Sequence, residues 1–498
     1  MFLGAACTAP LSIDNRSCPC SSDAYACCAL TNQCVPKDAM CPMFIALVDR
    51  PDGVVLQGEV INLTVTGVDL DGADNVSLGE IGLGAPADAR RDRFRMAITI
   101  PHGTALGAKT LRFTTHGGQK WYESPALVTV TPINVAEHGS DSAAGTARSP
   151  FATLARALVS AGAGDTVVLG PGTFGEQRDP SSPLKLPSSL TLEGAGKDMT
   201  RLSDALVSAG DLTLQALTLD QALRINGEGS RTNLSAVSAD GANVGFLVSE
   251  QAIGSTLVIG GATTINSSAG AAVESRGDRS TLRVIEHSTI ANLHDENGQA
   301  IRLTGNGQVL EINGSTINSV GPDAVTSTGK IDAWVQDSSI QGLLGLMGLG
   351  STAMVETTRF QISPAANAAG GISFIGAHLD VRDCSFQVVG LFQDSEDAGV
   401  VTVRGTKFEE YREPPVVLQR GTLDLGTATD PGRNQFKPVE QPGEPPVALQ
   451  VKAEPGTASV SCSMTTFSGD MPPAASVMGP AHSRGMYEID QMVPITFY

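Results

Sequence analysis

Residues 138–174 read HGSDSAAGTARSPFATLARALVSAGAGDTVVLGPGTF, and this stretch decides the fold of the chain. Ser149 stands where the N-cap of a helix belongs, and Pro150 stands at the first helical position. Gly162 follows at the point where a short helix would end. The sequence therefore predicts a helix over 150–161.

The predicted helix has one apolar side, and a strand follows it. Its apolar residues recur with helical spacing, at Phe151, Leu154, Ala155 and Leu158. A Gly-Asp turn, the apolar run at 166–169 and a Gly-Pro-Gly corner come next. We expect the apolar side to cover the first turn of a coil, where an open sheet edge would otherwise favour aggregation.

The phrases GSDSAAGTARSPFATLARAL and AGDTVVLGPGTF resemble the opening of the bacterial domain of unknown function fifteen-sixty-five. LDLGTATDPGRNQF, at 423–436, is similar to a second phrase in that family. The resemblance implies a right-handed parallel β-helix of the pectin-lyase-like kind and a secreted protein. It implies no activity, because a fold does not determine chemistry.

A six-residue repeat runs through 184–470. It consists of an apolar residue, two variable positions, a small residue, one variable position and a second apolar residue. The clear copies are IEHSTI (285–290), INGSTI (312–317), VQDSSI (335–340), VETTRF (355–360), VRDCSF (381–386) and VRGTKF (403–408). Successive copies start 27, 23, 20, 26 and 22 residues apart, which is typical of one turn of a three-sided solenoid.

Apolar residues five positions apart lie on opposite faces of a flat strand, so a corner must separate them. The repeat then predicts two buried ladders and about a dozen coils. The first ladder is Ile285, Ile312, Val335, Val355, Val381 and Val403, and the second is Ile290, Ile317, Ile340, Phe360, Phe386 and Phe408. We expect Cys384, at the small position of its copy, and Cys462 to be buried free thiols.

The composition agrees with a solenoid. The 498 residues include 55 glycines, 2 tryptophans and 5 tyrosines, and 17% are charged. The net charge of −19 argues against nucleic acid and anionic membrane surfaces as partners, and against polyanionic glycans unless a cation bridges them to the protein. No run of eighteen apolar residues is present, so we expect membrane association only through a lipid anchor. We expect a monomer.

Seven of the nine cysteines lie within the first 41 residues. MFLGAAC (1–7) resembles the end of a lipoprotein signal, which predicts lipidation of Cys7, although Gly4 stands where the motif has leucine. The alternative is that Cys7 is another disulfide cysteine. If Cys7 is the lipid anchor, six cysteines remain in the segment 8–42, where no histidine favours a zinc site. We expect these six to form disulfides: Cys18, Cys20, Cys27, Cys28, Cys34 and Cys41. The protein is therefore expected outside the cytoplasm, at the outer membrane or cell surface or secreted.

Between the cysteines and the β-helix (134–498), residues 43–133 alternate apolar and polar residues in short runs, which predicts a small immunoglobulin-like β-sandwich. GEVINLTVTGV and SPALVTVTPI resemble an IPT/TIG-type domain. DLDGADNV (69–76) has carboxylate spacing similar to part of a calcium loop. A polar turn explains it better, because the glutamate that completes such a loop is missing.

One outward column of the predicted coils is a candidate binding surface. The position before the first ladder is filled by Val284, Glu311, Trp334, Met354, Asp380 and Thr402. An outward Trp334 flanked by Glu311 and Asp380 would stack a sugar ring. The alternative, which we favour on general grounds, is that the following LLGLMGLG covers Trp334. Two acidic loops, at 294–297 and 394–397, are explained as solvated tips rather than calcium sites.

These observations predict an all-β, exported and lipid-anchored surface protein that binds glycans without catalysis. No metal and no cofactor is expected, with calcium as an open alternative. A competing hypothesis is a polysaccharide lyase or glycoside hydrolase, by analogy with the fold. A third is a purely structural surface protein.

Overall fold

A computed structural model of the chain describes residues 18–20, 24–28, 33–36, 44–47, 52–67, 70, 72–115, 120–177, 181–241, 245–267, 270–293, 298–362, 370–388, 390–393, 397–411, 413–439, 449–451, 458–463, 465–467, 487–489 and 495–497. The chain divides into two compact units. Unit 1 holds residues 1–133 and 144–149, and unit 2 holds 134–143 and 150–498. No helix in the described part of the chain is long and apolar enough to span a membrane.

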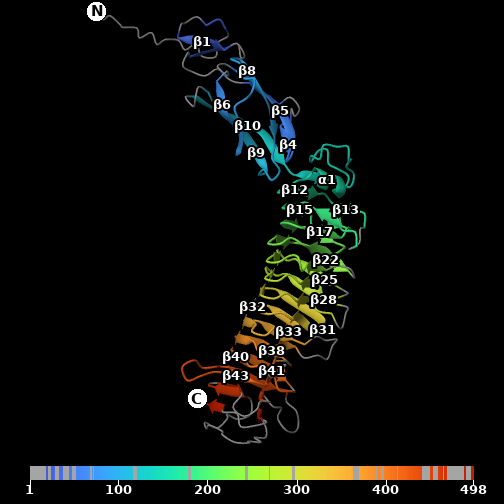
Figure 1. Ribbon diagram of the computed structural model, residues 1–498, viewed down its shortest axis with the longest axis vertical. Helices are drawn as coiled ribbons and strands as arrows, with labels where there is room; N and C mark the ends of the chain where they lie inside the picture. The colour runs from blue at the N-terminus through green and yellow to red at the C-terminus, as the bar shows by residue number, and fades with distance from the viewer. Residues whose placement is uncertain are drawn as a thin grey trace, which may run out of the picture. The chain divides into compact units, whose positions relative to one another are not determined.

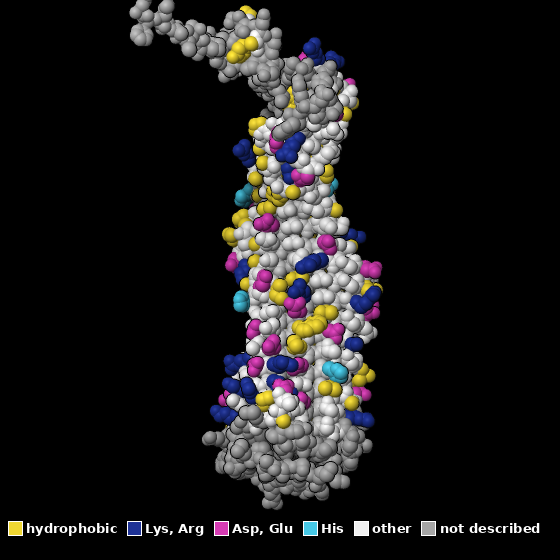
Figure 2. All heavy atoms as spheres, turned by 90° about the vertical axis from the view of Figure 1, so that its left-hand side faces the viewer, with side chains coloured by type: hydrophobic (Ala, Val, Ile, Leu, Met, Phe, Trp, Pro, Cys, Tyr) yellow, Lys and Arg dark blue, Asp and Glu magenta, His cyan; other side chains and the backbone are white. Residues whose placement is uncertain are grey.

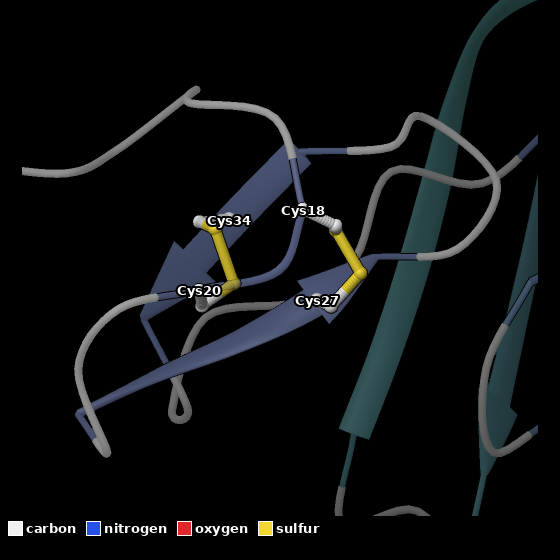
Figure 3. The surroundings of a disulfide bond; sticks show 4 residues. All are labelled: Cys18, Cys20, Cys27 and Cys34. Atoms are coloured by element: carbon white, nitrogen blue, oxygen red, sulfur yellow. A yellow bond between two sulfur atoms is a disulfide. The ribbon is translucent and has the colours of Figure 1, made fainter.

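Unit 1 begins with a hairpin of β1 (Tyr25–Cys28) and β2 (Gln33–Pro36). Disulfides Cys18–Cys27 and Cys20–Cys34 attach residues 18–20 to this hairpin (Figure 3). The sulfur atoms of Cys18, Cys20 and Cys34 lie as close together as metal ligands do, but each is bonded to another sulfur. Cys7, Cys41 and the side chain of Cys28 lie outside the described residues.

The rest of unit 1 is a small β-sandwich. One sheet has the order β4 (Val54–Leu56), β10 (Lys120–Thr131), β9 (Gly107–Thr115), β6 (Ala73–Leu78) and β7 (Ile81–Gly84). The other has the order β3 (Phe44–Leu47), β5 (Val60–Thr66) and β8 (Arg93–Thr99). Alternate residues of these strands form one buried core that includes Leu63, Phe94 and Phe113. Asp74 lies on β6 and accepts a hydrogen bond from the Thr114 hydroxyl, whereas Asp69 and Asp71 are outside the described residues.

Unit 2 is the expected parallel β-helix, with coils stacked from β12 downward in Figure 1. Each regular coil contributes one strand to a 15-stranded parallel sheet, here called the front sheet, and two to a 24-stranded sheet, the wide sheet. The front sheet consists of β11 (Ile133–Val135), β12 (Thr166–Leu169), β15 (Leu190–Gly194), β18 (Leu212–Gln215), β21 (Arg231–Ser235), β24 (Thr256–Gly260), β27 (Thr281–Val284), β30 (Gln308–Asn313), β32 (Ile331–Gln336), β34 (Thr352–Glu356), β37 (His378–Arg382), β40 (Gly399–Arg404), β43 (Gly421–Leu425), β46 (Ala458–Cys462) and β49 (Ile495–Phe497). The front sheet has 15 strands, more than the dozen coils expected from the repeat.

The second predicted ladder is confirmed. Its residues pair in register along the wide sheet, through β28 (Thr289–Asn292), β31 (Thr316–Ser327), β33 (Ser339–Leu346), β35 (Arg359–Gln361), β38 (Ser385–Gln387) and β41 (Lys407–Tyr411). Phe436 of β44 (Gln435–Pro438) extends the ladder by one coil. The rings of Phe360, Phe386, Phe408 and Phe436 stack with centroids 4.7, 5.1 and 4.6 Å apart. Such stacking of buried aromatic rings ties successive coils together.

The first ladder is confirmed except at its first residue. Val284, not Ile285, pairs with Ile312 and is buried. The corner after Val284 is one residue longer than the others, with both Glu286 and His287 at positive φ. In the regular copies a single residue at positive φ, such as Asp337 or Gly405, makes the corner that turns both apolar residues inward.

The helix prediction is wrong about where the helix begins. Helix α1 spans Leu154–Ser160, and the Thr153 hydroxyl is its N-cap, accepting from the Arg156 backbone N–H at 3.1 Å. Pro150 therefore precedes the helix, and Phe151 instead makes a β-bridge with Val135. The reason is that the backbone of Phe151 pairs with β11: its N–H donates to the Asn134 carbonyl and its carbonyl accepts from the Ala136 N–H, both at 2.9 Å. The Asp141 carboxylate then accepts from the backbone N–H groups of Ala152 and Thr153 just before the helix. The covering function is retained, because Leu154, Ala157 and Leu158 are buried.

Candidate binding surface

The outer face of the front sheet presents the column of residues singled out in the sequence. Glu311, Trp334, Met354, Asp380 and Thr402 are register partners on consecutive strands. Each stands between two buried residues of its own strand, as Trp334 does between Ala333 and Val335. Strand alternation therefore directs the whole column away from the core. Because β27 is shifted by one residue from its expected register, Arg283 rather than Val284 precedes Glu311 in the column.

Trp334 is not covered. It is 46% exposed, and its register partner Met354 is 43% exposed. The expected cover, residues 343–350, runs instead into β33 of the wide sheet, where Leu344 and Leu346 are buried in the core. The prediction that this segment covers Trp334 is therefore wrong.

A shallow depression of about 260 Å³ lies over β32, β34, β37 and β40. Trp334 and Met354 line it together with polar side chains that include His378, Asp380 and Thr402. Figure 2 faces the side of unit 2 that carries the labels β32, β40 and β43 in Figure 1, and there basic, acidic and hydrophobic side chains alternate. The surface therefore combines apolar contact area with hydrogen-bonding groups of both charges.

Two ion pairs lie on either side of the exposed Trp334 and Met354. On one side, Arg283 donates to Glu311 through Nε at 2.6 Å and through a second guanidinium nitrogen at 3.0 Å. On the other side, Arg382 donates to both carboxylate oxygens of Asp380 at 2.9–3.1 Å. The hydrogen bonds that Arg283 donates to Glu311 and Arg382 donates to Asp380 raise the pKa of both arginines, so both guanidinium groups stay charged. The pairs hold these side chains in defined positions at the surface.

A second outward column runs beside the first and was not noted in the sequence. Asp332, Thr352, His378 and Val400 are register partners on β32, β34, β37 and β40. The Thr352 hydroxyl donates to Asp332 at 2.6 Å, while His378 is exposed. Each member of the second column stands two residues before a member of the first column. Because residues two apart on a strand share a face, the second column could have been predicted from the first.

A third group of charges lies further along the same sheet. Arg404 donates to Asp424 at 2.8 Å and to Asp430 at 2.9 Å, and its side chain is 12% exposed. Burial opposes ionisation of Asp424, but hydrogen bonds from Arg404, the Gly426 N–H and Ser461 outweigh it and lower the pKa of Asp424. Arg404, Asp424 and Asp430 compensate one another's charges, which is typical of an ion-pair network that stabilises the fold.

The two predicted free thiols lie in the coils as expected. Cys384 and Cys462 are both buried and unpaired with another cysteine. Cys384 Sγ donates to the Arg382 carbonyl at 3.2 Å, at the corner where Ser338 donates to the Gln336 carbonyl at 2.6 Å. Cys384 therefore has the packing role of its serine counterparts. The loop residues 294–297 and 394–396 lie outside the described residues.

Comparison with known proteins gives a family for the first coils. Residues 137–213 match a family described as a protein of unknown function, DUF1565. The DUF1565 match spans α1 and reaches the start of β18, the same region in which the sequence resemblance was strongest. No curated protein and no solved structure matches the chain. Because DUF1565 is uncharacterised, the match supports the fold and assigns no activity.

Proposed function

We propose that the protein is an exported surface protein whose β-helix binds a glycan over Trp334, without catalysis. The observation that carries this proposal is the exposed Trp334 on a sheet face with hydrogen-bonding groups around it. A large aromatic side chain is seldom left exposed on a regular strand, and a sugar ring offers an apolar face that stacks on an indole.

The polar groups around Trp334 suit hydroxyl recognition. Asp380 lies two coils from Trp334, a separation of about 9–10 Å at roughly 4.8 Å per coil. The carboxylates of Glu311 and Asp380 keep acceptor capacity beyond the arginine hydrogen bonds, and Thr402 and His378 add further hydrogen-bonding groups. Because charges of both signs alternate on this face, the ligand proposed is an uncharged polysaccharide.

Binding is favoured over hydrolysis or elimination by the state of the charged groups. An acid catalyst needs a carboxyl with a raised pKa, and a lyase needs an unpaired basic group beside its substrate. Among the described residues of this face, Asp380 and Asp424 are hydrogen-bonded to arginine, and the pKa of Asp424 is lowered rather than raised. The hydrolase hypothesis therefore ranks second. The lyase hypothesis ranks beside it, because His378 is an exposed basic side chain at the depression and the release of oligosaccharides decides between lyase and binding protein.

Export is supported by the two disulfides, since such bridges persist in oxidising compartments. We propose that Cys7 carries the lipid that anchors the protein to the outer membrane or cell surface. Mass spectrometry of the N-terminal peptide from membrane fractions tests the anchor. An unmodified Cys7 in the membrane-bound protein would contradict it.

The experiment incubates the full chain with cellulose, xylan, chitin and mannan, with and without calcium. Retention of the protein is scored by pull-down, and soluble oligosaccharides are scored by mass spectrometry. We expect retention on at least one polysaccharide without release of fragments. Release would establish an enzyme and refute the binding proposal, whereas neither retention nor release would leave the purely structural role.

A further inference from the structure

Unit 1 carries a basic cluster that contrasts with the acidic chain. Residues 90–95 read RRDRFR, four arginines and one aspartate within a chain of net charge −19. All four arginines are exposed. We call the group of Arg90, Arg91, Arg93 and Arg95 the arginine patch.

Backbone hydrogen bonds fix the geometry of the arginine patch. Arg90 N–H donates to the Arg93 carbonyl at 2.8 Å, and Arg93 N–H donates to the Arg90 carbonyl at 3.3 Å, which closes a tight turn. Strand β8 begins at Arg93, and the following Phe94 is completely buried. Arg93 and Arg95 therefore project from the same outer face, about 7 Å apart along the strand.

The neighbours of the patch on this face are neutral. Opposite Arg93 and Arg95 on β5 lie Thr66 and Thr64, and Asn62 lies opposite Ala97. Strand β3, on the other side of β5, has the sequence FIAL without a charged residue. Within the described ranges, β5 and β8 present no carboxylate on this face. Asp88 and Asp92 adjoin the patch in the sequence, and the Leu70 N–H, between Asp69 and Asp71 in the sequence, donates to the Arg91 carbonyl at 3.1 Å, away from Arg93 and Arg95.

The arginines of the patch also differ in pairing from those of the β-helix. In the described part of the chain, Arg90, Arg93 and Arg95 make no ion pair, whereas Arg283, Arg382 and Arg404 each bind a carboxylate. A paired guanidinium has its charge compensated, while an unpaired and exposed one is available to an incoming anion. The charge of Arg90, Arg93 and Arg95 is therefore directed to solvent.

The net charge of the whole chain does not cancel this local field. At physiological salt, charges are screened over about 8 Å, so an anion at the patch is attracted mainly by the groups beside it. The expectation from net charge alone, that polyanions are excluded, does not apply at this surface.

We propose that the arginine patch is a second binding surface, specific for an acidic polysaccharide that carries sulfate or carboxylate groups. A flat strand face with guanidinium groups two residues apart, and threonine and asparagine beside them, matches a chain of regularly spaced anions and hydroxyls. Single-stranded nucleic acid fits less well, because the described outer residues of β5 and β8 include no aromatic side chain on which a base stacks. The surface is independent of Trp334 and does not rest on the glycan proposal for the β-helix.

The test measures binding of the full chain to immobilised heparin, beginning at about 50 mM salt, where charge contacts are strong. The test variant is Arg93→Ser with Arg95→Ser. The matched control is Arg224→Ser with Arg302→Ser, which removes two exposed arginines from β20 (Leu223–Ile225) and β29 (Ile301–Leu303). Circular dichroism of each variant verifies the fold, and Trp334→Ala is measured in parallel.

We expect the test variant to weaken heparin binding about tenfold and to lower the slope of log Kd against log salt by about two. The control variant and Trp334→Ala should bind like the wild type. An equal loss in both double variants would show a net-charge effect and overturn the proposal, as would wild-type protein that heparin does not retain. Tighter patch-dependent binding to oligo(dT) or to phosphatidylglycerol vesicles than to heparin would likewise overturn it.

Discussion

Trp334 of β32 and Met354 of β34 are register partners on neighbouring coils, and both remain more than 40% exposed. Side chains at most other apolar positions of these strands face the core. A tryptophan and a methionine side by side on an accessible sheet form an exposed apolar patch. Such patches mark binding sites. This relationship is the basis of the proposed glycan surface.

Removing the indole should abolish most of the glycan affinity without harming the fold. Trp334→Ala deletes the stacking surface, so we expect binding to the retained polysaccharide to fall at least about tenfold. The thermal midpoint should change much less than for a core substitution, because Trp334 is 46% exposed on the outer face of the sheet. Leu349→Ala is the control, since Leu349 is 61% exposed in the next loop and does not line the depression. Equal loss in both variants would refute a role for Trp334.

The stack of phenylalanines should be a main source of stability. Phe386→Ala leaves a cavity between Phe360 and Phe408, and a buried Phe-to-Ala change costs about 3–5 kcal/mol. We expect a lower urea midpoint and faster proteolysis within the coils. Val400→Ala, at a position 42% exposed, should leave both unchanged. A wild-type midpoint for Phe386→Ala would contradict the stacked core.

Cys384 should be chemically inert in the folded protein. Burial raises the pKa of its thiol to about 12, so the reactive thiolate is absent at neutral pH. Iodoacetamide at pH 8 should modify Cys384 only after denaturation, which peptide mass spectrometry resolves. Cys384→Ser should cost little stability, because Ser338 makes the same corner hydrogen bond. Rapid labelling of the native protein would contradict the buried position.

The Arg404 network should make stability depend on pH in a defined direction. The folded-state pKa of Asp424 lies below its ordinary value of 3.8. The contribution of Asp424 to folding stability is therefore complete above the pKa that Asp424 has in the unfolded chain. It is lost as the pH falls through the pKa of Asp424 in the folded protein. The thermal midpoint of Asp424→Asn should lie below that of wild type at pH 6, and the difference should shrink below about pH 4. A difference that grows on acidification would contradict the ion pair.

The N-cap of α1 should determine how stable this helix is. Thr153→Ala removes the hydroxyl that accepts from Arg156 and that also donates to Asp141 at 2.9 Å. Loss of such a cap costs about 1 kcal/mol. Hydrogen exchange in α1 should accelerate, while that in β43 stays the same. Unchanged exchange in α1 would show that Ser149 or another residue caps the helix.

The geometry of the coils could be predicted from the sequence, because every corner must turn the two apolar residues of its copy into the core. Val335 and Ile340 both reach the core once Asp337 adopts positive φ, and the same spacing predicts five of the six copies. It failed at Ile285, where the corner is longer by one residue. The prediction from the sequence also failed at the helix start, because Phe151, next to Pro150, pairs through its backbone with Asn134 and Ala136 instead of entering the helix.

The surface was harder to predict than the core. The residues after Trp334 seemed to cover it because they follow it in the chain, but a solenoid carries them around the next corner. Pairing of Arg283 with Glu311 depends on the register between coils, which local patterns do not fix. The arginine patch was overlooked because net charge averages over the whole chain.

The most direct test of the account follows Trp334 itself. The chain has two tryptophans, so Trp121→Phe leaves Trp334 as the only indole. Its fluorescence is titrated with a soluble oligosaccharide of the retained polysaccharide. We predict a saturable blue shift, with the same Kd as in the pull-down, because the sugar excludes water from the indole. Saturable binding without any change in Trp334 emission would contradict the proposed site.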